Sequence, residues 1–135
     1  MNNPSREEIK EVLDNAETIA VIGLSPNPSR TSYMVSEAMQ KAGYRIIPVN
    51  PQADMVLGEK SYASLSDIPH SVDIVNVFRR SEFLEDIAEE FVKIDCPVFW
   101  SQLNVVDENV FKKLTDLGFT VIMDRCIKVE HAILK

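Results

Sequence analysis

The chain has only two cysteines, Cys96 and Cys126, among its 135 residues. Two cysteines are too few for the disulfide framework of a small secreted protein, and no group of cysteines and histidines has the spacing of a zinc site. No apolar run approaches the roughly 20 residues that a membrane span requires. The first residues contain no apolar segment like that of a signal peptide. We therefore expect a reduced, cytoplasmic protein with no metal site and no membrane partner.

Positive charge is scarce as well. Lys and Arg number 14 against 21 Asp and Glu, which gives a formal net charge of −7. This balance argues against a general attraction to nucleic acids or anionic membranes. Hydrophobic residues make up 45% and charged residues 26% of the chain, a composition that excludes the disordered and fibrous classes. The length fits a single domain, residues 1–135.

Short apolar runs alternate with helical patterns along the chain. We predict that five of these runs form buried strands, namely residues 18–22, 45–49, 73–77, 98–100 and 120–123. Helical patterns lie before the first strand and after every strand except the second, where residues 50–72 are expected to form at most a turn or a short helix. The alternation predicts an α/β fold with a doubly wound, five-stranded, mainly parallel, Rossmann-like sheet and helices on both faces. With the strands numbered along the chain, we favour the order 3-2-1-4-5.

Four single residues predict local details of this fold. Ser5, Ser81 and Asp107 each precede a helical pattern and are expected to cap the helix that follows. Pro48 lies inside the second predicted strand. Because proline has no N–H to donate, it favours an edge position or a bulge for that strand.

Four arginines follow the carboxyl ends of the predicted strands: Arg30, Arg79, Arg80 and Arg125. In open α/β sheets, ligands bind at this edge, where the strand order reverses. Guanidinium groups suit phosphate oxygens, and two helices that begin here direct free N–H groups to the same place. The pattern predicts a site for an anionic small molecule. The alternative is that these arginines only neutralise nearby Asp and Glu side chains.

The loop that begins at Gly23 narrows the choice of anion. Ser25 and Pro28 stand where the dinucleotide fingerprint has its second and third glycines, so the match to that fingerprint is weak. Asn50 ends the second strand, where NAD enzymes carry an acidic residue for the ribose. The chain also has no P-loop motif. These features favour a nucleotide site of Rossmann type that is not built for NAD.

Several motifs occur together along almost the whole chain, roughly residues 5–134. They are Ala20-Val-Ile-Gly-Leu-Ser25, Asn27-Pro-Ser-Arg-Thr-Ser-Tyr33, Gly43-Tyr-Arg-Ile-Ile-Pro-Val-Asn-Pro51, Leu57-Gly-Glu-Lys60, Asp73-Ile-Val-Asn-Val-Phe-Arg-Arg-Ser81, Trp100-x-Gln102 and Met123-Asp-Arg-Cys126 with Glu130-His131. The combination resembles the bacterial CoA-binding protein family. Its members are stand-alone Rossmann-like domains similar to the CoA-binding domain of the succinyl-CoA ligase alpha subunit.

The resemblance implies coenzyme A or an acyl-CoA as the ligand. It implies that the diphosphate is cradled by Gly23, Ser25, Arg30, Ser32 and Tyr33, that Asn50 and Pro51 border the adenosine, and that Phe78, Arg79 and Arg80 line the cleft. The family usually has glycine at the position of Asn104. Because asparagine tolerates a left-handed backbone, we expect the turn there to persist. Gln102 is expected to face the cleft.

Few residues are candidates for catalysis. A thiolate at Cys126, beside Arg125, would be reactive, but His131 lies about 140° away around the predicted helix, a poor arrangement for a nucleophile and its base. We therefore assign no catalytic residue and expect Cys126 to be buried and inert. Cys96 is expected to lie in the core, and Trp100 is expected to serve packing. The alternatives left open are a CoA-dependent acyl carrier or transfer activity through Cys126, a module that docks on a larger ligase, and a homodimer.

Overall fold

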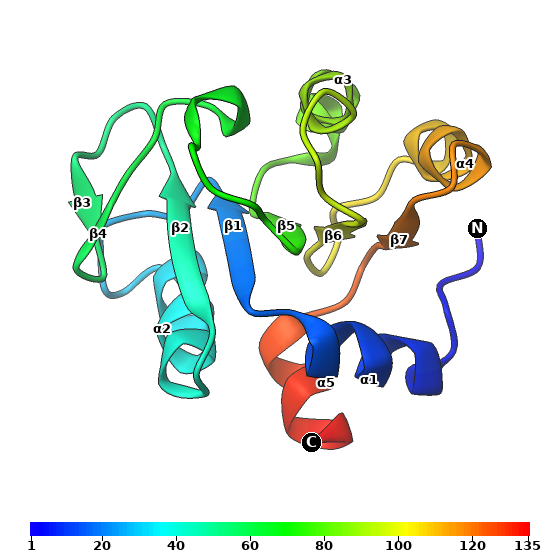
Figure 1. The fold of residues 1–135 in the computed structure, drawn as a ribbon, viewed down its shortest axis with the longest axis horizontal. Coiled ribbons are helices and arrows are strands. Elements are labelled where there is room, and N and C mark those ends of the chain that lie inside the picture. The colour runs from blue at the N-terminus through cyan, green and yellow to red at the C-terminus, as the bar shows by residue number, and fades with distance from the viewer.

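A computed structural model describes residues 1–135. Five parallel strands form a central sheet with helices on both sides (Figure 1). The strands are β1 (Thr18–Ile22), β2 (Arg45–Val49), β5 (Ile74–Val77), β6 (Val98–Ser101) and β7 (Thr120–Ile122). The helices are α1 (Arg6–Asn15), α2 (Thr31–Lys41), α3 (Leu84–Phe91), α4 (Glu108–Asp116) and α5 (Ile127–Leu134). The predicted α/β class and the doubly wound five-stranded sheet are confirmed.

The strands run across the sheet in the order β2-β1-β5-β6-β7, and all neighbouring pairs are parallel. We expected the third strand of the chain, now β5, to lie beyond β2, but it pairs with β1 on the side away from β2. The chain thus moves from β1 out to β2 and returns past β1 to β5. The direction of winding reverses between β1 and β5, so the carboxyl ends of these two strands border the crevice where such sheets bind ligands.

Pro48 explains why β2 lies at an edge. The carbonyl of Val49 accepts a hydrogen bond from Gly23 on the β1 side, whereas the carbonyl of Pro48 accepts one from the N–H of Tyr62 at 3.0 Å. Proline therefore turns its missing N–H away from β1, and the β1–β2 ladder loses no hydrogen bond. A full strand beyond β2 would need that N–H, so Pro48 suits the edge position that β2 has.

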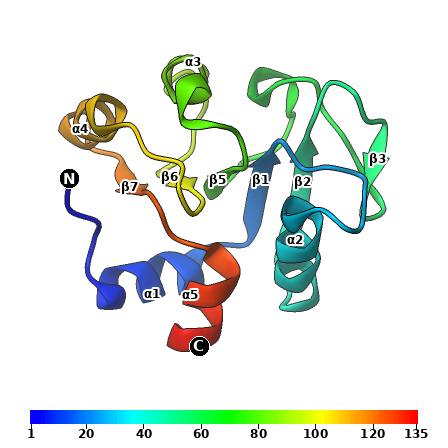
Figure 2. The ribbon, with the colours of Figure 1, turned by 180° about the vertical axis from the view of Figure 1, so that it is seen from behind.

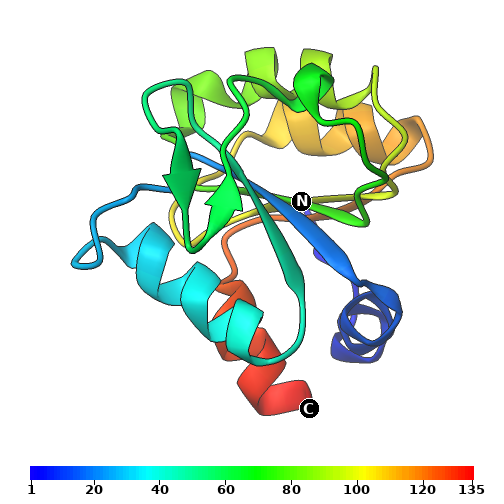
Figure 3. The ribbon, with the colours of Figure 1, turned by 60° about the vertical axis from the view of Figure 1, so that its left-hand side comes forward.

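Residues 50–72 contain more structure than the sequence indicated. β3 (Met55–Val56) and β4 (Glu59–Lys60) form an antiparallel hairpin, followed by a 3₁₀ turn over Leu65–Asp67. The hairpin turn is made by Leu57 and Gly58, both with positive φ, as two-residue hairpin loops require. Figure 3 shows the hairpin beside β2.

The sheet has a core on each face. α3 and α4 cover one face, while α1, α2 and α5 cover the other (Figures 1 and 2). Side chains of β1 belong to both cores. Ala20 and Ile22 pack on the face covered by α3 and α4, and Ile19 and Val21 pack on the face covered by α1, α2 and α5. Burial on both faces is why this strand is apolar without interruption. None of the helices combines the length and the hydropathy that crossing a membrane demands.

Two of the three expected helix caps are confirmed. Side-chain oxygens of Ser5 and Asp107 accept backbone hydrogen bonds at the starts of α1 and α4. Ser81 instead opens a 3₁₀ turn ahead of α3, whose N-cap residue Phe83 makes no side-chain hydrogen bond. The Ser81 hydroxyl accepts a hydrogen bond from the N–H of Val106 at 2.9 Å. This residue therefore ties the loop after β5 to the loop after β6.

The side chain of Asn3 occupies the β7 edge of the sheet. Its Nδ2 donates to the carbonyl of Met123 at 2.8 Å, and its Oδ1 accepts from the N–H of Met123 at 2.9 Å. We expect Asn3→Ala to lower the free energy of unfolding by about 1–2 kcal/mol, because two partly buried hydrogen bonds are lost. Urea unfolding followed by the fluorescence of the single, buried Trp100 measures this change. Asn2→Ala is the control, and equal stability of the two variants would contradict the prediction.

Candidate functional site

The loops that follow β1 and β5 meet at Gly23. This residue turns the chain with a φ of +83°. A Cβ atom here would lie 2.5 Å from the carbonyl oxygen of Phe78 and 3.1 Å from the Cδ of Arg79. Glycine therefore allows both the left-handed backbone and the close approach of the two loops. Their contact holds Arg79 beside the carboxyl end of β1.

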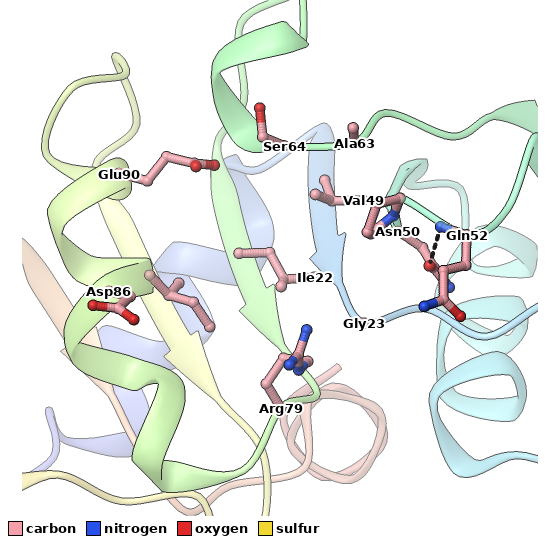
Figure 4. Close-up of a pocket in the computed structure, with 12 residues that line it drawn as sticks. Ile22, Gly23, Val49, Asn50, Gln52, Ala63, Ser64, Arg79, Asp86 and Glu90 are labelled. Atoms are coloured by element: carbon pink, nitrogen blue, oxygen red, sulfur yellow. Dashed lines mark hydrogen bonds between the residues drawn. The ribbon is translucent and has the colours of Figure 1, made fainter.

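A cavity of about 490 Å³, which we call the first cavity, opens at this contact. Its wall is formed by the ends of β1 and β2, the loop after β2, and α3 (Figure 4). Asn50 and Gln52 lie on one side, Asp86 and Glu90 of α3 on the other, and Arg79 at the end near Gly23. The cavity thus lies at the crevice that the strand order indicates.

A second cavity, of about 640 Å³, lies on the other side of Arg79. It is lined by Thr31 at the start of α2, by the loops after β5 and β6, and by Cys126 just before α5. Arg79 lines both cavities. Each volume is in the range of small-molecule pockets, and Arg79 is the residue that forms part of both walls.

The arginines after β5 differ in their partners. Arg80 forms an ion pair with Glu82 at 3.0 Å, and its side chain lines only the second cavity. Arg79 forms no ion pair, and its guanidinium lies over the ring of Phe83, 4.3 Å from the centroid. This contact orients the group without neutralising it. Of the two arginines that line the cavities, Arg79 is therefore the one that is in no ion pair.

The first turn of α2 adds free donors. Its N-cap, Arg30, makes no side-chain capping bond. The N–H groups of Thr31, Ser32 and Tyr33 donate to no acceptor within the chain. These groups and the positive end of the helix dipole favour an anion. Because Thr31 also lines the second cavity, the helix begins at the site.

Side chains within the loop before α2 hold that loop in place. The N–H of Ser25 donates to the Oγ of Ser32 at 3.1 Å, and the Oγ of Ser25 accepts from the N–H of Asn27 at 3.1 Å. Ser25 and Ser32 thus brace the loop, and they line neither cavity. Their contact with a diphosphate stays a prediction.

Asn50 joins the loops after β1 and β2. Its Nδ2 donates to the carbonyl of Leu24 at 3.0 Å, and its Oδ1 accepts from the N–H of Gln52 at 2.9 Å (Figure 4). Both ends of the amide are used, so this side chain shapes the wall of the first cavity. It also provides no carboxylate for the ribose contact that NAD enzymes make.

α3 brings negative charge to the first cavity. Asp86 and Glu90 line the side that faces Asn50. An oxygen of Glu90 also accepts a hydrogen bond from the N–H of Leu65, which links α3 to the segment after β4. Because carboxylates repel phosphates, an anionic group fits this cavity only at its Arg79 end.

A buried amide pair lies beneath the second cavity. Asn76 on β5 is 1% exposed and Gln102 is 6% exposed. The Nε2 of Gln102 donates to the Oδ1 of Asn76 at 2.6 Å, and the Oε1 of Gln102 accepts no hydrogen bond from the chain. Gln102 lines the second cavity, as expected from the sequence. Its unpartnered oxygen is an acceptor for a ligand N–H.

The loops after β6 and β7 are linked by two residues with left-handed backbone. Asn104 has a φ of +66° and Asp124 a φ of +60°. The N–H of Asn104 donates to the Oδ1 of Asp124 at 2.7 Å. The turn expected at Asn104 is therefore confirmed, and it lines the second cavity.

The two cysteines have different surroundings. Cys96 is 2% exposed, its thiol donates to the carbonyl of Val98 at 3.5 Å, and burial raises the pKa of this thiol to about 12. Cys126 is only partly buried and lines the second cavity, so the expectation that it is buried was wrong. His131 lines a different cavity, with its ring edge-on to Tyr44, so it is not paired with Cys126.

Trp100 serves packing, as expected. It is fully buried, and its Nε1 donates to the carbonyl of Arg125 at 2.8 Å. The N–H of Arg125 in turn donates to the carbonyl of Ser101 at 3.4 Å. β6 therefore fixes the backbone just before Cys126.

The structure brings six of the predicted binding residues to the cavities: Gly23, Asn50, Pro51, Phe78, Arg79 and Arg80. The predicted residues Ser25, Arg30, Ser32 and Tyr33, and also Arg125, line neither cavity. Sequence reasoning missed Ser64 and Glu90 in the first cavity. No local pattern marks them, because they meet only through the packing of residues 61–67 against α3.

Comparisons with known proteins agree on a family. A family model described as CoA binding domain matches residues 17–132. An uncharacterized protein of Bacillus subtilis, YneT, is 58% identical over 135 residues, which are 100% of each chain. A Thermus thermophilus protein of solved structure, cell-free ID.343, is 36% identical with a TM-score of 0.93, covering 98% of this chain and 100% of that one.

One relative with a named activity is much longer. The alpha subunit of an ADP-forming acetate–CoA ligase II from Pyrococcus furiosus is 33% identical over 72 residues. The match covers 53% of this chain but only 16% of that subunit. This chain therefore resembles one part of a longer ligase subunit.

Proposed function

This chain belongs to the CoA binding domain family, and from that membership we propose that it binds coenzyme A or an acyl-CoA across the two cavities. The diphosphate lies at Gly23, Arg79 and the first turn of α2. The adenosine occupies the first cavity, and the pantetheine arm occupies the second.

The chemistry of the two cavities supports this orientation. The first offers neutral polar groups along the loop after β2 and carboxylates on α3, which suit the adenine amino group; because the carboxylates repel phosphates, the 3′-phosphate of CoA lies at the Arg79 end or in solvent. The second combines apolar side chains, among them Phe78, Leu103 and Val105, with the free acceptor of Gln102. An arm with methyl groups and two amides matches that mixture.

The observation that carries the proposal is the position of Arg79 between two cavities. A diphosphate with a bulky group on each side needs a cation at its centre and room at both ends. Arg79 is in no ion pair and lines both cavities. The free N–H groups of α2 add to the positive potential there.

Isothermal titration calorimetry with CoA, dephospho-CoA, ADP and NAD tests the proposal. We expect CoA to bind more tightly than ADP, because ADP leaves the second cavity empty, and more tightly than NAD. Comparison with dephospho-CoA measures the contribution of the 3′-phosphate. Tighter binding of NAD, or no heat with CoA, would refute the proposed function.

The match to a ligase subunit favours a second candidate, a module that docks on a larger ligase. Since the 72 matched residues are 16% of that subunit, most of the subunit has no counterpart in the match and would come from a partner. Light scattering of the chain mixed with the other parts of such a ligase from the same organism tests this. A stable complex is expected if the chain is such a module, and its absence would exclude that role.

A further inference from the structure

We propose that Cys126 reacts with CoA disulfide and holds one CoA as a mixed disulfide, an inference that rests on the proposed binding of CoA. The protein would thus be a reversible covalent acceptor for CoA under oxidising conditions. Cys126 is the residue just before α5, and it lines the second cavity.

The position of Cys126 is the first ground for this inference. It lines the same cavity as Arg79, so a ligand whose diphosphate contacts Arg79 can extend its arm toward this thiol. The thiol makes no hydrogen bond in the chain, whereas the thiol of Cys96 is bonded to the carbonyl of Val98 and shielded from solvent. Cys126 is partly buried against the core and lines a cavity of the proposed site, whereas Cys96 is 2% exposed and lines neither cavity.

Gln102 is the second, independent ground. The residue is 6% exposed. Its Nε2 donates to the Oδ1 of Asn76, and its Oε1 accepts no hydrogen bond from the chain. An acceptor that has no partner in the chain and lies at a cavity wall is available to a ligand N–H. The pantetheine arm carries two amide N–H groups between the diphosphate and the sulfur. Gln102 therefore provides a contact for the arm that leads to Cys126.

The surroundings of Cys126 are also held in place. Trp100 and Ser101 of β6 bond the backbone of Arg125, the residue before it. A sulfur on a fixed backbone needs less reorganisation to reach the geometry of exchange.

The reaction is thiol–disulfide exchange. The Cys126 thiol gives its proton to solvent, and its sulfur attacks one sulfur of CoA disulfide. A new S–S bond joins Cys126 to CoA as the original S–S bond breaks. The other CoA leaves as a thiolate and takes up a proton. One disulfide is consumed and one is formed, so no further oxidant is needed, and a free thiol reverses the step.

Intact-protein mass spectrometry after incubation with CoA disulfide tests the proposal. We expect one CoA per chain, removed by dithiothreitol. The adduct should form at least about tenfold faster than the adduct with glutathione disulfide, because only the CoA compound is bound beside the thiol. Cys126→Ser should abolish the adduct, and Cys96→Ser, the matched control, should retain it.

Several outcomes would overturn the inference. These are no adduct, an adduct that survives Cys126→Ser, or equal rates with the two disulfides. Calorimetric titration of Cys126→Ser with reduced CoA separates the two proposals: if CoA still binds while wild type forms no adduct, only the disulfide inference fails.

Discussion

Replacing Arg79 with alanine is expected to weaken CoA binding by about ten- to a hundredfold, with little change in stability. The guanidinium is in no ion pair, so it can bind a diphosphate without first breaking one. Hydrogen bonds to a charged group contribute about 1.5–3 kcal/mol, which corresponds to this range of affinity. Calorimetric titration of the variant with CoA measures the loss.

Two other arginines provide controls for Arg79. Arg45→Ala removes an equal charge at the start of β2, the opposite end of the sheet, and should leave CoA affinity unchanged. Arg80→Ala should cause a smaller loss than Arg79→Ala, because Arg80 already pairs with Glu82. If Arg79→Ala and Arg45→Ala bind CoA equally well, the proposed position of the diphosphate is wrong, even if the chain binds CoA.

Gly23→Ala should lower the free energy of unfolding by about 2–4 kcal/mol and also impair CoA binding. The added Cβ meets the carbonyl of Phe78 at 2.5 Å, and a backbone atom moves only at a cost. The φ of +83° adds the strain of a left-handed conformation for a residue with a side chain. Urea unfolding and titration with CoA measure the two effects.

Gly58→Ala is the matched control for Gly23→Ala. Gly58 has a similar φ of +77°, but a Cβ there would meet nothing within 4 Å. Only the conformational strain of about 1–2 kcal/mol is expected, with CoA binding retained. If both variants lose equal stability, the close approach of the loops at Gly23 makes no contribution of its own.

The elements of this fold are predictable from the sequence because most of them are buried on one face or on both. An uninterrupted apolar run such as residues 18–22 can hardly be other than an inner strand. The hairpin at residues 55–60 was missed because two-residue strands are too short to show a periodic pattern. The strand order also differed, since periodicity identifies strands and not their neighbours. Pro48 indicated an edge position for the second strand, because proline has no N–H to offer a further full strand.

The site could be predicted in part for similar reasons. Gly23, Arg79 and Gln102 directly follow strands, and the carboxyl ends of parallel strands meet at one edge. Residues that reach the site from elsewhere were not predictable. Glu90 lies two helical turns inside α3, and Ser64 lies in an irregular segment, so only tertiary packing shows their place.

At both edges of the sheet, backbone groups are bonded by residues that belong to no further strand of the sheet. At one margin Tyr62 bonds the backbone of β2 beside Pro48, and at the other Asn3 satisfies Met123 through a side-chain amide. A second molecule cannot continue either ladder until one of these contacts is released. Fibril growth by edge-to-edge stacking of this sheet is therefore disfavoured in the native state.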